Sequence, residues 1–222
     1  MTQAALVTEA LSKEFRSGGH RVAVLDGVSF QVRAGESLAV MGRSGSGKST
    51  LLNLLCGLET PDTGLIIVDG ETFDCGGARY VDKQWGELRR RSIGVVFQEA
   101  NLMPALSLLD NVRLRTHLAG QRGGDERHWL ERLGLAAEAD RYPDQVSGGQ
   151  AQRAALAMVF AMAPTLILAD EPTGSLDRHT ADQVADCLFA MQRETGCALV
   201  LATHDAGLGE RCDECLDLTA AG

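Results

Sequence analysis

The residues best suited to chemistry lie in one glycine-rich stretch, GRSGSGKST, at positions 42–50. It matches the pattern G-x-x-x-x-G-K-[ST], in which glycines let successive backbone amides turn onto one anion. In this pattern Lys48 reaches the β- and γ-phosphates of a nucleotide and Ser49 offers its hydroxyl to Mg²⁺, and we expect Thr50 to contact the α-phosphate. An apolar strand precedes the stretch and an apolar helical run, LLNLLCGL, follows, so the positive end of a helix dipole faces the same point. This context predicts a phosphate-binding loop rather than an ordinary glycine-rich turn.

Four further polar residues follow the apolar runs LILA, IGVVF and ALVLAT. They are Asp170 and Glu171, Gln98, and His204, and ligands of open α/β sheets lie beyond the carboxyl ends of the strands. Adjacent carboxylates leaving one strand point in different directions, so one can hold Mg²⁺ while the other faces a water. The amide of Gln98 can contact both metal and water. His204 can bond the γ-phosphate or hold the partner of the water, although a single histidine at a strand end is usually a satisfied loop residue.

The elements that must position these residues can be read from periodicity. Residues 5–11 and 21–32 alternate like antiparallel strands, and three continuous aliphatic runs are typical of parallel strands buried on both faces. The strands expected after the phosphate loop are 65–68, 93–97, 166–169 and 198–203. The expected helices are 106–119, 126–134, 148–162 and 179–194, with the glycine-rich GQRGGD as a break. We therefore predict an α/β fold, a single domain over 1–222 with a helical subdomain inserted at about 100–162.

Composition restricts the class of protein. The 222 residues can bury one full core, and the net charge of −9 argues against a nucleic-acid partner. The basic cluster Arg89–Arg91 is interpreted as a solvated helix end. No apolar run approaches the roughly 18 to 20 residues that span a bilayer, and the N-terminus MTQAALVTEA lacks the layout of a signal peptide. We expect a cytoplasmic protein that attaches to a membrane, if at all, through a protein partner.

The six cysteines are expected to be reduced thiols, because the cytosol does not sustain structural disulfides. Cys56, Cys187 and Cys197 lie inside apolar patterns and are interpreted as small buried hydrophobes. Cys212 and Cys215 form a C-x-x-C pair, but a zinc site normally needs a second pair or added histidines. The sequence therefore favours no metal or redox role for this pair.

The stretch VSGGQ, residues 146–150, begins the alanine-rich helix and indicates a further binding site. Ser147 is suited to cap the helix, and Gly148 and Gly149 leave its N-terminus open, which makes a second anion site separate from the first. One chain cannot close both sites on the same nucleotide.

Taken in order, GRSGSGKS, Gln98, VSGGQ, LILADE, the loop 174–177 and His204 resemble the full motif set of ATP-binding cassette (ABC) ATPases. The resemblance implies a head-to-tail homodimer in which VSGGQ of one subunit covers ATP held by the phosphate loop of the other, with Asp177 at the seam. It assigns Asp170 to Mg²⁺ together with Ser49 and Gln98, and Glu171 to the water, with Gln98 and His204 as further catalytic residues. The residues that it implies in nucleotide binding are Phe15, Gly42, Ser44, Gly45, Ser46, Gly47, Lys48, Ser49, Thr50, Ser147, Gly148, Gly149, Gln150 and Asp177.

One departure from the family pattern concerns Phe15, which stands where a tyrosine usually stacks on adenine. Its ring can still offer a face to the base, although an aromatic residue before a turn can also be a plain core residue. The absence of an N-K-x-D motif disfavours a GTPase, and VSGGQ disfavours a small-molecule kinase. The length disfavours tandem translation-factor and DNA-repair types.

Within the family, VFQEANLMPALSLLDNV and LADEPTGSLD are similar to segments of the lipoprotein-release and macrolide-export ATPases, with the cell-division ATPase close by. Two functions therefore stay open. One is a transport motor that drives transmembrane permease subunits, in export or extraction of a lipoprotein, lipid or hydrophobic compound. The other is an ATP-switched module that signals through a membrane partner.

Overall fold

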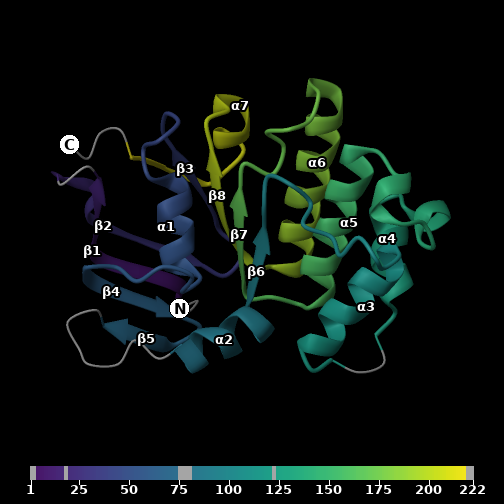
Figure 1. Cartoon of the computed structure of the whole chain (residues 1–222), viewed down its shortest axis with the longest axis horizontal. Coiled ribbons are helices and arrows are strands. Elements are labelled where there is room, and N and C mark those ends of the chain that lie inside the picture. Colours follow the sequence, from purple (N-terminus) through teal and green to yellow (C-terminus); the bar gives the residue numbers. More distant parts are fainter. Residues whose placement is uncertain (1–3, 18–19, 75–81, 122–123, 219–222) are drawn as a thin grey trace.

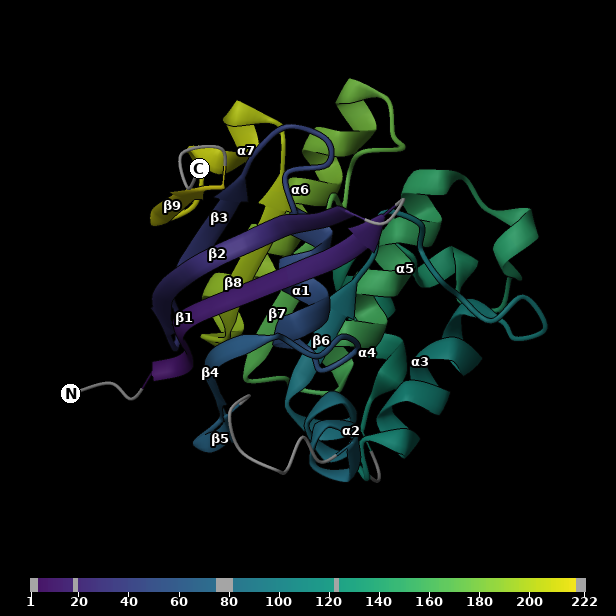
Figure 2. The same cartoon turned by 60° about the vertical axis from the view of Figure 1, so that its left-hand side comes forward.

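The computed structural model describes residues 4–17, 20–74, 82–121 and 124–218. Two sheets enclose helix α1 (Lys48–Leu55), which lies between them in both Figure 1 and Figure 2. Leu51, Leu52, Leu54 and Leu55 of α1 are buried in one core with side chains from both sheets. The helix that begins at the phosphate loop is thus fixed on both sides by apolar packing.

The parallel sheet has the strand order β6-β7-β8-β3-β9, and every neighbouring pair in it is parallel. Its strands are β3 (Ser37–Met41), β6 (Ile93–Val96), β7 (Leu166–Asp170), β8 (Ala198–Thr203) and β9 (Glu214–Asp217). All six residues of β8 are buried, as its unbroken aliphatic sequence predicts. The carboxyl ends of β6, β7, β8 and β3 are adjacent along one edge, which brings together the four places where polar residues follow an apolar run.

The antiparallel sheet has the order β2-β1-β4-β5. Its strands are β1 (Ala4–Ser17), β2 (His20–Arg33), β4 (Thr63–Val68) and β5 (Glu71–Asp74). The prediction ended the first strand at residue 11, whereas β1 continues to Ser17. Register shifts occur at several points of the β1–β2 pair, and each bulge breaks the two-residue period on which the prediction relied.

Helices cover the other face of the parallel sheet, on the right of Figure 1. Here α3 (Leu108–Leu118), α4 (Glu126–Arg132), α5 (Gly148–Ala161) and α6 (Arg178–Thr195) share a second core with β6, β7 and β8, and two 3-10 turns, Ala136–Glu138 and Pro143–Gln145, precede α5. The α/β fold class is confirmed. The bounds of the inserted subdomain at 100–162 stay a prediction, and GQRGGD falls partly outside the described residues.

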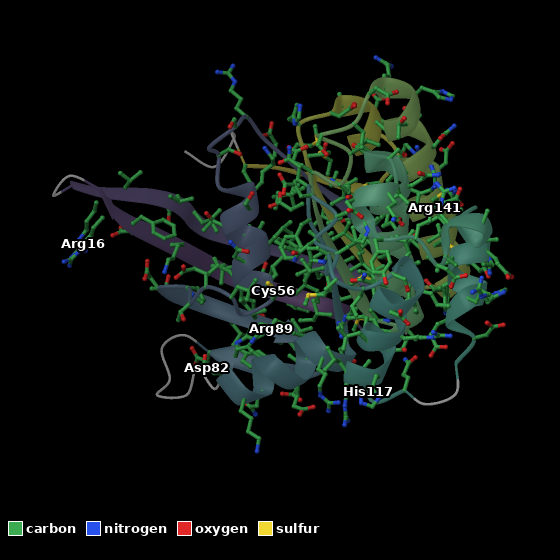
Figure 3. The ribbon with its side chains drawn as sticks, turned by 45° about the vertical axis from the view of Figure 1, so that its right-hand side comes forward. Arg16, Cys56, Asp82, Arg89, His117 and Arg141 are labelled. Atoms are coloured by element: carbon green, nitrogen blue, oxygen red, sulfur yellow. The ribbon has the colours of Figure 1, made fainter. Side chains whose placement is uncertain are left out.

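Two short elements, α2 (Asp82–Arg91) and α7 (Ala206–Gly209), complete the described chain. The interpretation of Arg89–Arg91 as a solvated helix end was wrong for Arg89. Its Nη1 atom donates to the backbone oxygens of Cys56 and Gly57 at 2.9 and 3.0 Å, and Figure 3 shows Arg89 beside Cys56. The carbonyls at the end of α1 lack partners in the helix, so a basic side chain from α2 binds them instead. Among the described residues no helix is both long and apolar enough to cross a membrane.

Candidate active site

A cleft of about 740 Å³ opens at the carboxyl edge of the parallel sheet. It brings together residues that the sequence separates by up to 189 positions, from Phe15 to His204. The residues that line it are Phe15, Val24, Arg43, Ser44, Gly45, Gly47, Lys48, Ser49, Thr50, Gln98, Glu171, Gly174 and His204. Most of the predicted phosphate loop, all three catalytic candidates (Gln98, Glu171 and His204) and Phe15, the candidate residue for stacking on the base, therefore share one cavity.

At two positions of the loop, Gly42 and Gly47, there is no room for a larger side chain. Gly47 has a φ of +96°, and a Cβ atom there would lie 2.8 Å from Val24 Cγ1. A Cβ atom on Gly42 would lie 2.2 Å from Ser46 Oγ. Gly42 and Ser46 are not among the residues that line the cleft, and their close approach to each other affects the shape of the loop. The loop can take this path only with hydrogen at these positions.

Lys48 is 7% exposed and its ammonium group is held inside the loop. Its Nζ donates to the backbone oxygens of Gly42 at 2.7 Å and Arg43 at 3.3 Å, and lies 3.7 Å from Glu171 Oε1. The ammonium is therefore already placed at the cleft, with backbone acceptors that an incoming anion can replace.

The two carboxylates at the end of β7 contact different neighbours, as their alternation along the chain predicts. Glu171 Oε1 lies 2.8 Å from Nδ1 of His204, and Thr203 Oγ1 donates to Glu171 Oε2 at 3.4 Å. Glu171 has a φ of +45°, which costs about 1 kcal/mol or more for a residue with a side chain. Such a conformation persists where the surroundings impose it, and here it turns the carboxylate into the cleft.

Asp170 faces the other way, toward Ser49. Burial raises the pKa of Asp170, a hydrogen bond from Ser49 opposes this, and the neighbouring charge of Glu171 raises the pKa further. Its Oδ1 atom is buried and has no hydrogen-bond partner within the described residues. A buried carboxylate oxygen without a donor, beside a hydroxyl, is suited to a hard cation such as Mg²⁺.

Gln98 follows β6 and lines the cleft. The amide nitrogen of its side chain lies 3.2 Å from the position that a Cβ on Gly174 would take. Its backbone oxygen accepts a hydrogen bond from Ser175 Oγ at 3.3 Å. The segment after β6 is thus bonded to the loop after β7.

VSGGQ lies outside the cleft. Ser147 caps α5, with its Oγ accepting from the Gln150 backbone at 3.3 Å, while Gln150 Oε1 accepts from the Ser147 backbone at 2.9 Å. Ser147 and Gly148 are exposed, and a Cβ on Gly149 would lie 2.2 Å from Thr180 Cγ2. The predicted helix cap is confirmed, and the chain holds two separate candidate anion sites.

Asp177 lies next to this second site because it caps the neighbouring helix α6. Its Oδ1 accepts from the backbone of Thr180 at 3.1 Å and its Oδ2 from the Thr180 hydroxyl at 2.6 Å, and these bonds lower the pKa of Asp177. The same Thr180 contacts the position of Gly149. The exposed caps of α5 and α6 therefore form one continuous surface.

Three cleft residues were missed or left without a role by the sequence reasoning. Arg43 is a basic residue inside the loop motif and could have been found by its charge. Gly174 was noted only as part of its loop. Val24 carries no sequence signal, because only the pairing of β1 with β2 brings it onto Gly47.

Phe15 is 40% exposed and lines the cleft, so it is not a plain core residue. The cysteines mostly behave as expected, with Cys56 and Cys197 buried, whereas Cys187 is half-buried. Burial raises the pKa of Cys212 to about 11, and the described residues contain no group of three or more His, Cys, Asp or Glu side chains placed to hold a metal. Cys75 lies outside the described residues.

Comparison with known proteins gives one consistent family. A family model described as ABC transporter matches residues 25–174. The chain is 42% identical over 212 residues to an Escherichia coli K12 protein named "Uncharacterized ABC transporter ATP-binding protein YbbA", covering 94% of this chain and 91% of that protein. It is also 42% identical over 221 residues to the lipoprotein-releasing system ATP-binding protein LolD of Bordetella pertussis, covering 98% of this chain and 94% of that protein.

Solved structures agree with the sequence relatives. The dimeric post-hydrolysis structure of the ATP-binding cassette MJ0796 with ADP and Pi has a TM-score of 0.83 and 32% identity, covering 96% of this chain and 93% of that one. The CbiO1 protein of Clostridium perfringens, part of the ABC transporter complex CbiONQ, has a TM-score of 0.80 and 30% identity, covering 96% and 84%. The sheets, the phosphate loop, the strand-end carboxylates and these relatives together show that the chain belongs to the ABC transporter family, as an ATP-binding ATPase subunit.

Proposed function

We propose that this chain binds Mg²⁺ and ATP and hydrolyses the ATP within a head-to-tail homodimer, and that the cycle drives transmembrane permease subunits. The observation that carries the proposal is the separation of the two candidate anion sites. The phosphate loop and Glu171 share the cleft, whereas Ser147 lies on the exposed surface outside it. A second copy placed head to tail brings the missing half to each cleft.

The phosphate loop and Lys48 hold the triphosphate. Backbone amides of residues 43–49 surround the phosphates, and Lys48 exchanges its contacts with Gly42 and Arg43 for the β- and γ-phosphates. Thr50 contacts the α-phosphate, and Phe15 stacks on the base at the far end of the cleft.

Ser49, Asp170 and Gln98 would hold Mg²⁺. When bound, the ion neutralises phosphate charge and polarises the phosphoryl oxygens. The buried Oδ1 of Asp170, which has no partner within the described residues, supports this assignment. Asp170 must be ionised to serve as a ligand. Burial favours the protonated form of its carboxyl group, so Mg²⁺ competes with a proton for this site.

Glu171 activates the attacking water. Its carboxylate accepts a proton from the water as the oxygen bonds to the γ-phosphorus, and the bond to the β-phosphate oxygen breaks to leave ADP and phosphate. His204 orients this carboxylate through the 2.8 Å contact at Nδ1 and is exposed enough to reach the γ-phosphate.

A trans-complementation experiment tests the dimer. Lys48→Ala removes the phosphate contact and Ser147→Arg blocks the α5 cap, so we expect each variant alone to lack ATPase activity. In a mixed dimer one cleft combines the intact phosphate loop of the Ser147→Arg subunit with the intact VSGGQ of the Lys48→Ala subunit. Mixing the purified variants should therefore restore phosphate release, and continued inactivity of the mixture would contradict the head-to-tail arrangement.

A groove of about 300 Å³ beside β6 and α5 supports a protein partner. Leu58 and Phe97 line it and are 56% and 37% exposed, and apolar surface of this kind marks interaction sites. Phe97 in the groove directly precedes Gln98 in the cleft. A partner that moves Phe97 would therefore also move Gln98 relative to the nucleotide. Through such a partner the chain is held on the cytoplasmic face of a membrane.

The relative LolD supports export or extraction of a lipoprotein, lipid or hydrophobic compound rather than signalling. The neighbouring genes provide the test. A four-helix permease with a large periplasmic domain encoded beside this chain would support extraction, whereas a cell-division membrane protein there would support the signalling alternative.

A further inference from the structure

Lys13 is a buried cation outside the cleft, and it takes no part in the proposed mechanism. It lies on β1, is 8% exposed, and donates from Nζ to Glu59 Oε1 at 2.8 Å and to the backbone oxygen of Thr60 at 2.6 Å. Asp62 Oδ1 lies 3.8 Å from the same nitrogen. The hydrogen bond with Lys13 lowers the pKa of Glu59, which favours the carboxylate form that binds the lysine. The ammonium is thus held by three residues of one loop.

That loop, residues 56–62, connects the carboxyl end of α1 to β4. Its backbone is also bonded to β1, because the Asp62 amide donates to the Ser12 oxygen at 2.9 Å and the Glu14 amide donates to Asp62 Oδ2 at 2.7 Å. The amino end of α1 carries Lys48 and the phosphate loop. A short hydrogen-bonded path therefore runs from the phosphate loop, along α1, to the segment of β1 around Lys13.

Phe15 lies two residues further along the same strand. The Lys13 ammonium lies over its ring, 5.2 Å from the centroid, which is within the range of a cation–π contact. The ring itself is 40% exposed at the border of the cleft. One face of this partly exposed ring is thus covered by a cation that Glu59, Thr60 and Asp62 hold.

The shape of the hairpin makes such support necessary. Lys13 pairs with Leu25 between two register shifts, one toward Leu11 and one toward Glu14. Bulges bend a strand and re-aim its side chains, and here they leave Val24 packed on Gly47 of the phosphate loop. Beyond the bend the hairpin projects from the body, as the position of Arg16 in Figure 3 shows. Contacts near the bend therefore fix where Phe15 lies relative to the phosphates.

We propose that Lys13, anchored to Glu59, Thr60 and Asp62, is a positioning residue that holds the ring of Phe15 at a set distance from the phosphate loop and so prepares the base-binding end of the cleft. This rests on the proposed role of Phe15 in stacking on the base. Because the ring is ordered before the nucleotide arrives, binding does not have to restrict it. The effect falls on the base and leaves the phosphates untouched.

Comparison of two ligands tests this, because ADP has a base and inorganic pyrophosphate has none. Calorimetric titration of Lys13→Met should show about threefold to tenfold weaker ADP binding, from loss of the cation–π contact and of preorganisation, with pyrophosphate binding unchanged. Lys13→Arg should retain most of the ADP affinity, since a guanidinium keeps the positive charge and can also lie over the ring. Lys83→Met, which removes an exposed lysine on α2, is the matched control and should change neither ligand.

A double variant decides whether Lys13 acts through Phe15. Phe15→Ala should weaken ADP binding about tenfold, and adding Lys13→Met to it should cause no further loss. The inference would be overturned if Lys13→Met weakened pyrophosphate binding as much as ADP binding, or if Lys13→Met still weakened ADP binding in the Phe15→Ala background. It would also be overturned if Phe15→Ala weakened ADP binding while Lys13→Met left ADP binding unchanged. Unchanged ADP binding by Phe15→Ala would instead refute the base-stacking role itself. Retained pyrophosphate affinity and a cooperative thermal transition above the assay temperature show that the variants are folded.

Discussion

Replacing Glu171 with Gln separates nucleotide binding from the chemical step. The amide is nearly the same shape. Its oxygen can still accept from one of the two side chains that contact Glu171, His204 at 2.8 Å or Thr203 at 3.4 Å, and its nitrogen takes the place of the second carboxylate oxygen. It cannot accept the proton of the water. We therefore expect a folded protein that binds ATP but does not turn it over.

The structure sets the size of each effect. Loss of a general base lowers a rate by typically about 10² to 10⁴, so turnover should fall about a thousandfold. Lys48 lies 3.7 Å from Glu171, beyond hydrogen-bond distance, and keeps its two carbonyl contacts. Removing the carboxylate also removes a competitor of the phosphates for Lys48. The affinity for ATP should therefore be equal to that of the wild type or somewhat higher.

Phosphate release at saturating ATP and Mg²⁺ measures the first effect, and size-exclusion chromatography with light scattering measures the second. Glu171→Gln should elute as a stable dimer with two nucleotides, because in the proposed cycle only hydrolysis releases the closed dimer. Glu210→Gln, an exposed change at the end of α7, is the matched control and should behave as the wild type. Turnover by Glu171→Gln within about tenfold of the wild type would refute its role as the base. A dimer stable with ATP from Asp170→Asn, with Glu171→Gln monomeric and active, would reverse the two assignments.

Three other variants probe the rest of the site and its support. Ser147→Arg should leave nucleotide binding by the single subunit intact while abolishing hydrolysis and ATP-dependent dimerisation in light scattering; hydrolysis at the wild-type rate would reduce VSGGQ to a helix cap. Asp170 has a raised pKa when folded, so the folded chain holds its proton more tightly than the unfolded chain and stability falls as the pH rises above the ordinary value of 3.8. Without Mg²⁺ and nucleotide at neutral pH, Asp170→Asn should therefore raise the free energy of unfolding by about 1 kcal/mol, and a lower thermal midpoint would contradict this. Arg89→Met keeps the side-chain stem but leaves the carbonyls of Cys56 and Gly57 without their donor, at a cost of about 2 kcal/mol in urea unfolding; an unchanged midpoint would show that water replaces the guanidinium.

The motifs were readable from the sequence because each is a local structure. A phosphate loop needs glycine where φ is positive or a Cβ would clash, and Gly47 meets both conditions. The cap at Ser147 needs a hydroxyl three residues before its backbone donor. Buried parallel strands such as β8 need unbroken aliphatic runs. These requirements act within a few residues, so the α/β class, the strand ends and the candidate catalytic side chains could all be predicted.

What the sequence could not supply were contacts between distant segments. The alternation that marks a strand is lost at the bulges of β1 and β2, so neither the length of β1 nor the approach of Val24 to Gly47 was predictable. The sequence led us to interpret Arg89 as a solvated charge, because its partners, the carbonyls at the end of α1, lie more than thirty positions away along the chain. The anchoring of Lys13 by the loop after α1 spans a still larger separation, 46 and 47 positions. Local propensity and spacing determine which groups are present, whereas burial, charge pairing and the distance from Phe15 to the phosphate loop arise only when the two sheets close around α1.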